Sequence, residues 1–142
     1  MNTAAQMIAE KTVAEVMTTD LLTLKLTDTL RLADDMLNLA QIRHFPVVNG
    51  ENVAGIVNQD DLLHASMASL VQHPKDSPRA VLGAVMVKDI MKPATVIAPD
   101  MPIRAAAKTM VEKAIEALVV VRDGKLLGLV TRTDLLRELA KS

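Results

Sequence analysis

Residues 55–63 read GIVNQDDLL and residues 128–136 read GLVTRTDLL, so one block occurs twice at a spacing of 73 positions. Two further blocks recur in the same order: Val16-Met17 with Ile90-Met91, and Pro46-Val47-Val48 with Val119-Val120-Val121. A repeat of this length, present in only two copies, differs from the short units of solenoids. It predicts two similar halves packed about a pseudo-twofold axis in one globule, and clefts between packed parts are common ligand sites.

Each copy predicts the same order of elements, which is strand, helix, strand, strand, helix, and therefore an α/β fold. In the first copy we expect these elements at 21–26, from Thr27-Asp28, at 45–48, at 53–57 and from Asp60. In the second copy we expect them at 94–98, from Asp100-Met101-Pro102, at 118–121, at 126–130 and from Thr133. The residues at the helix starts favour caps and first turns. Asn49-Gly50 and Asp123-Gly124 are typical of tight hairpins.

The repeats suggest a division of the chain into three segments. We place the first repeat at 13–66, a connector at 67–86 and the second repeat at 87–140. The connector contains Pro74 and Pro78 among polar residues, which indicates a loop between two helical stretches. Half of the 142 residues are apolar, which is enough to form a core.

The composition argues against several function classes. A net charge of −1 and a single aromatic residue, Phe45, argue against nucleic-acid binding. The absence of Cys excludes disulfides and Cys-based zinc sites. His44, His64 and His73 are scattered and form no metal-binding or catalytic pattern, so we expect neither an enzyme nor a metal site. The sequence contains no recognisable signal peptide or membrane-spanning stretch, so we expect a cytoplasmic protein.

The segment Thr131-Arg132-Thr133-Asp134 precedes an apolar run and has two interpretations. The first is a capping box, in which the Thr131 hydroxyl and the Asp134 carboxylate only stabilise a helix start. The second is a ligand site, because a helix N-terminus holds phosphate and a carboxylate there accepts hydrogen bonds from a ribose diol. Gly128 would then let the backbone approach the ligand closely. Alone, the motif favours the cap, because short motifs often occur by chance.

The whole pattern resembles a tandem pair of CBS domains, the regulatory module named after cystathionine β-synthase. The resemblance covers about residues 13–139 and rests on the paired opening blocks, the paired strands and the two Gly-h-h-x-x-x-Asp-Leu blocks. It implies two clefts that bind AMP, ADP, ATP or S-adenosylmethionine. In each cleft the Asp of one copy holds the ribose, and the hydroxyl three residues earlier assists. The resemblance also implies pairing through helices, so we expect a homodimer.

Carried over residue by residue, the resemblance implies a first site, site A. Its residues are Thr27, Ile42, Arg43, His44, Thr131, Thr133 and Asp134. Arg43 carries a permanent positive charge on a planar fork that suits phosphate oxygens. His44 would add a donor or a positive charge. The alternative for both residues is a solvated helix end, where cations complement the helix dipole.

The resemblance implies a second site, site B, that departs from the family pattern. Its residues are Asn58, Asp61, Ile115, Glu116 and Ala117, with Asp60 beside them. Asn58 replaces the usual hydroxyl residue, and Glu116 stands where site A has Arg43. Three carboxylates near a phosphate would repel it. We therefore expect site B to be empty, or to hold a ligand with few negative charges.

These observations predict a stand-alone regulatory module that binds an adenine nucleotide and signals to a separate effector protein. No prosthetic group is expected, and Mg²⁺ would enter only with ATP. Two alternatives remain open: a ligand-free dimerisation or interaction module, and a module that binds S-adenosylmethionine.

Overall fold

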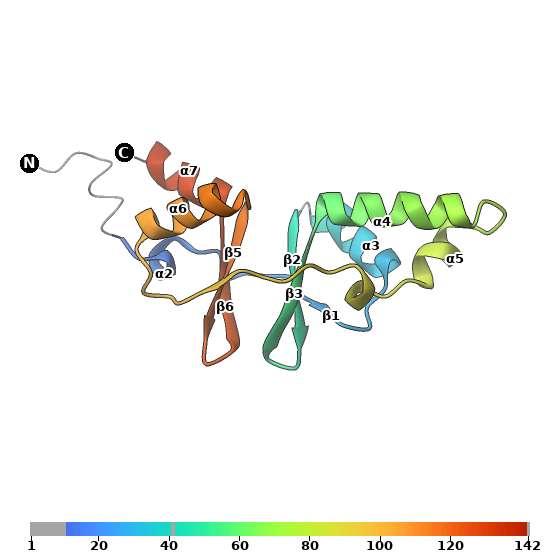
Figure 1. The fold of residues 1–142 in the computed structure, drawn as a ribbon, viewed down its shortest axis with the longest axis horizontal. Helices are drawn as coiled ribbons and strands as arrows, with labels where there is room; N and C mark the ends of the chain where they lie inside the picture. The colour runs from blue at the N-terminus through green and yellow to red at the C-terminus, as the bar shows by residue number, and fades with distance from the viewer. Residues whose placement is uncertain (1–10, 41, 142) are drawn as a thin grey trace, which may run out of the picture. The chain divides into compact units, whose positions relative to one another are not determined.

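The structure is a computed structural model that describes residues 11–40 and 42–141. The chain forms two compact units (Figure 1). The middle unit spans residues 22–94. The terminal unit combines the described residues up to Leu21 with those from Thr95 onward. The terminal unit is therefore built from two distant parts of the chain.

Over the residues described, the middle unit contains three strands, three α-helices and a short 3₁₀ turn. In chain order these are β1 (Leu24–Lys25), α3 (Leu30–Ala40), β2 (His44–Asn49), β3 (Asn52–Asn58), α4 (Gln59–Gln72), α5 (Pro78–Gly83) and η1 (Val87–Asp89). Strand β1 is parallel to β2, and β2 is antiparallel to β3, with Val47 opposite both Leu24 and Gly55. The three α-helices contact one another, so the unit has a sheet and a helical layer.

The terminal unit repeats this arrangement with its own three strands. Its elements are α2 (Val13–Val16), β4 (Val96–Ile97), α6 (Ile103–Lys113), β5 (Ala117–Arg122), β6 (Lys125–Thr131) and α7 (Arg132–Ala140). Strand β4 is parallel to β5, and β5 is antiparallel to β6, with Val119 opposite both Val96 and Leu129. Helix α7 contacts both α2 and α6. The predicted α/β fold and its order of elements are confirmed.

The starts of the first long helix in each repeat differ from the prediction. Asp28 does not cap α3, because its carboxylate accepts a hydrogen bond from Lys25 N at 2.7 Å and closes the turn after β1. Thr29 does so instead, since its hydroxyl accepts from Leu32 N at 3.2 Å. In the second copy, Pro102 occupies the N-cap of α6 and makes no side-chain cap bond. The predicted strands at 21–26 and 94–98 are also shorter, with two residues each.

The two hairpins have two-residue turns of different types. Asp123 and Gly124 both have positive φ, at 52° and 79°, as the predicted Asp-Gly turn requires. In the first hairpin Asn49 is still paired, opposite Asn52, so the turn is made by Gly50 and Glu51. Of these two residues, Gly50 alone has positive φ, at 64°. The position expected for this first turn was therefore early by one residue.

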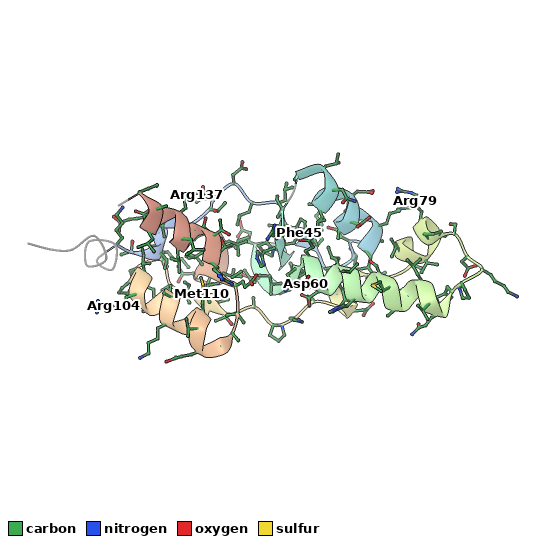
Figure 2. The ribbon with its side chains drawn as sticks, turned by 90° about the horizontal axis from the view of Figure 1, so that it is seen from above. Phe45, Asp60, Arg79, Arg104, Met110 and Arg137 are labelled. Carbon is green, nitrogen blue, oxygen red and sulfur yellow. The ribbon has the colours of Figure 1, made fainter. Side chains whose placement is uncertain are left out.

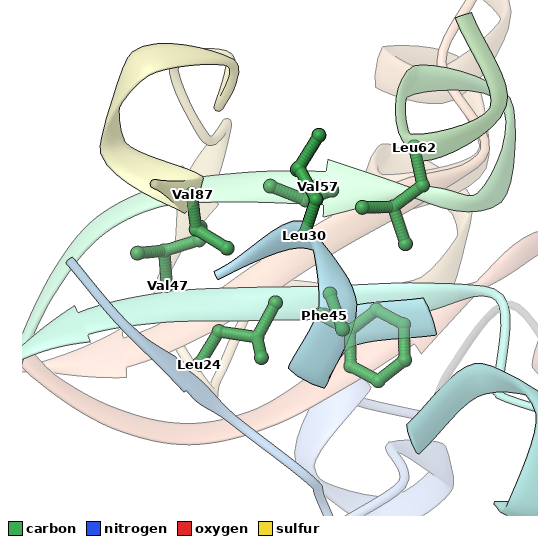
Figure 3. Packing of buried hydrophobic residues seen from close by; sticks show 8 residues of the cluster. Leu24, Leu30, Phe45, Val47, Val57, Leu62 and Val87 are labelled. Atoms are coloured by element: carbon green, nitrogen blue, oxygen red, sulfur yellow. The ribbon is translucent and has the colours of Figure 1, made fainter. Parts of the chain in front are cut away.

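Each unit has its own apolar core. The buried core of the middle unit contains Leu24, Leu30, Ala33, Phe45, Val47, Val57, Leu62 and Val87 (Figure 3). The buried core of the terminal unit contains Val13, Ile97, Ala106, Met110, Leu118, Val120 and Val130. In Figure 2, Met110 lies within the terminal unit. Both cores are aliphatic except for Phe45, which is fully buried.

The opening segment of each repeat belongs to the unit that contains the other repeat's hairpin. Val13 opens the first repeat but completes the core of the terminal unit, and Val87 opens the second repeat but completes the core of the middle unit. Backbone hydrogen bonds hold these segments, including Val13 N to Met101 O at 2.8 Å and Val87 N to Asp28 O at 2.7 Å. The positions 13 and 87 therefore mark sequence repeats, whereas the compact units change at 21/22 and 94/95.

None of the helices within residues 11–40 and 42–141 has the length and apolar character needed to cross a bilayer.

Candidate functional site

The capping box predicted at the start of α7 is present. Asp134 N donates to Thr131 Oγ1 at 3.2 Å, and Thr131 N donates to Asp134 Oδ2 at 2.9 Å. The bonds form because both residues lie within one turn at the β6–α7 junction, where the first helical N–H groups have no helical partner. Asp134 is only 6% exposed, although it is charged. Its second carboxylate oxygen therefore needs a partner.

The second oxygen of Asp134 is held by side chains outside the box. Thr18 Oγ1 donates to Asp134 Oδ1 at 3.0 Å, and Arg137 Nη1 lies 3.5 Å from the same oxygen. Thr18 is brought there by the backbone, because Thr18 and Leu129 exchange N–H to O bonds of 2.8 and 3.0 Å. No motif in the sequence predicted a role for Thr18. Its only signal was its position directly after the repeated Val16-Met17 block.

Gly128 is a point of close approach, but the neighbour is the chain itself. A Cβ on Gly128 would lie 2.7 Å from Met17 Sδ and 2.8 Å from the carbonyl oxygen of Thr18. Both distances are too short for a side chain. The expected role of Gly128 in contacting a ligand is therefore corrected: the glycine accommodates the segment that carries Thr18.

The middle unit contains the equivalent arrangement with one change of chemistry. Asp61 N donates to Asn58 Oδ1 at 2.7 Å, and Asn58 N donates to Asp61 Oδ2 at 3.1 Å, so the capping box is again complete. The second oxygen, Asp61 Oδ1, is 2.6 Å from Lys92 Nζ. Lys92 directly follows Met91, as Thr18 follows Met17. It too is held by paired backbone bonds, to Ile56 at 2.9 Å each.

The residues predicted for site A are divided between the units. Thr131, Thr133 and Asp134 belong to the terminal unit, and Thr27, Ile42, Arg43 and His44 belong to the middle unit. Thr133 is exposed on the first turn of α7, and the side chain of Arg43 is exposed just before β2. Ile42 and His44 are half-buried, and the Arg43 carbonyl accepts from Gln59 N at 2.9 Å.

Thr27 lies at the edge of a surface hollow of about 550 Å³ in the middle unit. The other lining residues are Asp28, Thr29, Arg31, Leu32, Asp35 and Arg79. Arg79 and Asp35 form an ion pair of 3.6 Å across this hollow, and both side chains are substantially exposed. The hollow that Thr27 lines therefore contains both acidic and basic side chains.

The residues predicted for site B are divided in the same way. Asn58 and Asp61 lie in the middle unit, and Ile115, Glu116 and Ala117 lead into β5 in the terminal unit. Ile115 and Glu116 border an apolar hollow of about 550 Å³ between α6 and α7. The Glu116 side chain forms an ion pair with Arg132, whose Nη1 is 3.7 Å from Glu116 Oε1.

Two of the carboxylates expected to repel a phosphate at site B have a cation beside them. Asp61 is paired with Lys92, and Glu116 is paired with Arg132, in each case within its own unit. The Lys92 contact is the closer of the two, at 2.6 Å from a carboxylate that is 9% exposed, whereas both side chains of the Glu116–Arg132 pair are exposed. The two Asp residues differ in the groups that contact their Oδ1 atoms.

A second buried acid lies one turn beyond Asp134. Glu138 is 6% exposed and forms hydrogen bonds with Lys11 and with Lys141, the latter at 3.4 Å. The Lys11 hydrogen bond lowers the pKa of Glu138 and correspondingly raises the pKa of Lys11. This ion pair attaches the opening segment to α7. Within the part of the chain that the structure describes, no three His, Cys, Asp or Glu side chains gather as a metal site would require.

Comparisons with known proteins identify the family. The CBS domain family matches residues 13–68 and 87–141. A CBS domain-containing protein of Dictyostelium discoideum is 34% identical over 132 residues, which cover 91% of each chain. A 33.4 kDa protein from a ribosomal RNA operon of Thermofilum pendens is 33% identical over 131 residues. That match covers 91% of this chain but 44% of the Thermofilum protein, so the chain spans less than half of that relative.

Two solved structures share the fold and more than a quarter of the residues. The acetoin utilization protein AcuB of Vibrio cholerae is 28% identical with a TM-score of 0.77, and the match covers 92% of this chain and 91% of AcuB. CBSX2, crystallised in complex with AMP, is 26% identical with a TM-score of 0.75 over 92% of this chain and 96% of CBSX2. The repeated blocks, the two matching α/β units and these similarities agree, and the chain belongs to the CBS domain family as a tandem pair of CBS domains.

Proposed function

We propose that this CBS pair is a regulatory module that binds an adenine nucleotide and transmits its bound state to a separate effector protein. CBS-domain proteins are generally regulatory rather than catalytic, and the similar protein CBSX2 was crystallised with AMP. A ligand changes such a module only to the extent that it binds two conformations unequally. The module must therefore contain a group that binds the ligand specifically.

The environment of the Asp134 carboxylate supports this proposal most directly. A buried carboxylate held in place by Thr131 and Thr18 is pre-organised to accept hydrogen bonds from a ribose diol. It lies in the first turn of α7, a nine-residue helix whose N-terminal N–H groups and dipole favour a phosphate. The same short segment thus offers complementary groups for both the sugar and the phosphate of a nucleotide.

The remaining contacts are those that the family resemblance assigns. We propose Thr133 and Thr131 beside Asp134, with Thr27, Ile42, Arg43 and His44 completing site A. Arg43 supplies the permanent cation for a phosphate. Asn58, Asp61, Ile115, Glu116 and Ala117 form the second, weaker site B. We further propose that the protein is cytoplasmic, and that Mg²⁺ enters only as the counterion of ATP.

A thermal-shift panel with a matched pair of variants tests the proposal. The panel contains AMP, ADP, ATP with and without Mg²⁺, and S-adenosylmethionine. A ligand at 100 times its Kd stabilises a protein by about 2.7 kcal/mol, which corresponds to roughly 5 to 15 °C for a chain of this size. We expect a shift with an adenine nucleotide that is lost in Asp134→Ala and retained in Asp61→Ala. No shift with any nucleotide in the wild type overturns the proposal.

A ligand-free dimerisation module is the second candidate, because α4 presents an exposed apolar stripe. Leu63, Met67 and Val71 are spaced by four residues and are 54%, 56% and 78% exposed, so they lie along one face of the helix. Light scattering of the wild type and of Met67→Glu tests this function. A dimer that Met67→Glu dissociates, in a protein that binds no nucleotide, favours this candidate. A monomer at all concentrations excludes it.

A further inference from the structure

We infer that the residue after each repeated methionine, Thr18 or Lys92, determines which of the two equivalent carboxylates accepts a ribose diol. This inference rests on the proposed function and deepens it. It attributes the proposed weakness of the Asp61 site to one side chain, Lys92. Neither Thr18 nor Lys92 belongs to the motif that predicted the site.

The two carboxylates differ at one oxygen. In both, Oδ2 accepts from the main-chain N–H of the capping residue, at 2.9 Å for Asp134 and 3.1 Å for Asp61. In both, Oδ1 faces the residue that follows the methionine. That residue contributes a hydroxyl at 3.0 Å to Asp134 and an ammonium at 2.6 Å to Asp61. The backbone hydrogen bonds are the same in both units, so the two sites differ in the side chain that contacts Oδ1.

The Thr18 hydroxyl leaves Asp134 able to bind a diol. A hydroxyl is neutral and has both a donor and acceptor lone pairs. While it donates to Oδ1, its own oxygen remains available to accept from a sugar hydroxyl. Arg137, the other group near Oδ1, has a side chain that is 64% exposed and lies at 3.5 Å. Asp134 therefore retains acceptor capacity toward a ligand, because its one cationic neighbour among the contacts given lies at 3.5 Å rather than at 2.6 Å.

The Lys92 ammonium acts in the opposite way on Asp61. It has three donors and no acceptor, and a charge-assisted bond to a carboxylate is about twice as strong as a neutral one. The Asp61 side chain is 9% exposed and that of Lys92 is 65% exposed, but the bond is short, at 2.6 Å. A diol hydroxyl must displace the ammonium to reach Oδ1. Lys92 thus keeps Asp61 occupied and neutralised.

Backbone hydrogen bonds hold Thr18 and Lys92 in place, so a substitution at either position should leave the backbone there unchanged. Thr18 is paired with Leu129, and Lys92 is paired with Ile56, each by two backbone bonds of 2.8 to 3.0 Å. Gly128 and Gly55 allow these segments to approach closely, with the segments' carbonyl oxygens 2.8 Å from where a Cβ would lie. A substitution at 18 or 92 therefore changes the chemistry at Oδ1 while the local frame is retained.

Reciprocal substitutions test the inference by isothermal titration with adenosine, which carries the diol and no phosphate. We expect one adenosine site in the wild type. Thr18→Lys should weaken that site at least about tenfold, as expected for a charge-assisted bond that must be broken. Lys92→Thr should create a second adenosine site, which Asp61→Ala removes and Asp134→Ala does not. Lys92→Met, which keeps the stem and removes the charge, should also open this site and serves if Lys92→Thr does not fold.

Two controls isolate the diol and the hydroxyl. Thr18→Ser retains the hydroxyl and should keep wild-type affinity. The probe 2′,3′-dideoxyadenosine lacks the diol, so the exchanges should not alter its binding. Unchanged adenosine affinity in Thr18→Lys, with no second site in either Lys92 variant, overturns the inference while the proposed function stands. If the wild type binds neither adenosine nor any of AMP, ADP and ATP, the proposed function fails and this inference fails with it.

Discussion

Met17 and Gly128, at opposite ends of the chain, are in direct contact: a Cβ on Gly128 would lie 2.7 Å from Met17 Sδ. The middle unit repeats the relationship, since a Cβ on Gly55 would lie 2.8 Å from Met91 Sδ. The methionine and the glycine are the recurring features of each sequence repeat. Each methionine packs against the glycine of the other repeat, and this pairing holds the opening segments in place.

Gly128→Ala should therefore destabilise the protein by about 1–3 kcal/mol, the usual range for overpacking a filled site. The added Cβ would lie 2.8 Å from the carbonyl oxygen of Thr18, and a backbone atom moves aside less easily than a side chain. Urea unfolding measures the effect. Gly83→Ala is the control, because its Cβ would meet Arg31 at an ordinary 3.5 Å. Equal stability of the two variants would contradict the predicted clash.

Each opening segment packs in the core that contains the other repeat's hairpin, and this predicts which strands a core mutation loosens. Val13→Ala and Val87→Ala each remove the two terminal methyl groups of a fully buried side chain, at a cost of roughly 1–3 kcal/mol. Native-state hydrogen exchange locates the loosened region. Val13→Ala should accelerate exchange in β5 and β6, and Val87→Ala should accelerate it in β2 and β3. The reverse pattern would mean that each opening segment packs within its own repeat.

The Lys11–Glu138 ion pair predicts a pH-dependent contribution to stability. Its hydrogen bond lowers the pKa of Glu138 below the ordinary value of 4.5, so the native state binds this proton less readily than the unfolded chain does. The contribution is therefore present above about pH 4.5 and is lost as the pH falls through the lower native pKa. For Lys11, whose pKa is raised above 10.5, the contribution is present below that pH and is lost as the pH rises through the higher native pKa.

Urea unfolding of Glu138→Gln at pH 7 and pH 3 measures this effect. The variant should be less stable than the wild type at pH 7, and the difference should shrink at pH 3. Glu112→Gln is the matched control, because Glu112 pairs with Lys108 at 3.9 Å and both side chains are largely exposed. Exposed pairs of this kind contribute little. A constant difference between wild type and Glu138→Gln at both pH values would refute the linkage.

Thr131 caps α7, whereas Thr133 is proposed only to bind the ligand, so substitutions at the two positions should differ in their effect on stability. Thr131→Ala removes the hydroxyl that accepts from Asp134 N and should destabilise the protein by about 1 kcal/mol. Thr131→Ser retains the cap and should restore most of the stability. Thr133 is exposed in the same turn, so Thr133→Ala should change stability by no more than about 0.5 kcal/mol. Thermal unfolding without ligand measures all three, and a large loss in Thr133→Ala would show a structural role.

Much of the local structure was predictable because it depends on neighbours in the chain. The capping boxes at Asn58 and Thr131 join residues three positions apart, and the Asp123-Gly124 turn depends on two residues that tolerate positive φ. The predicted cap of α3 was wrong because three consecutive polar residues, Thr27, Asp28 and Thr29, precede the helix. In the structure Asp28 accepts from Lys25 N and closes the preceding turn, so Thr29 caps the helix instead.

The amino-acid sequence by itself determined the repeat, the order of strands and helices, the capping boxes and the membership of a tandem CBS pair. These features follow from interactions within a few residues, or from patterns that recur 73 positions apart. Only the tertiary structure decided that Thr18 contacts Asp134 and that Lys92 contacts Asp61. Those contacts join segments that are distant in the chain. Their partners are set by which strand each opening segment pairs with, and no local pattern encodes that choice.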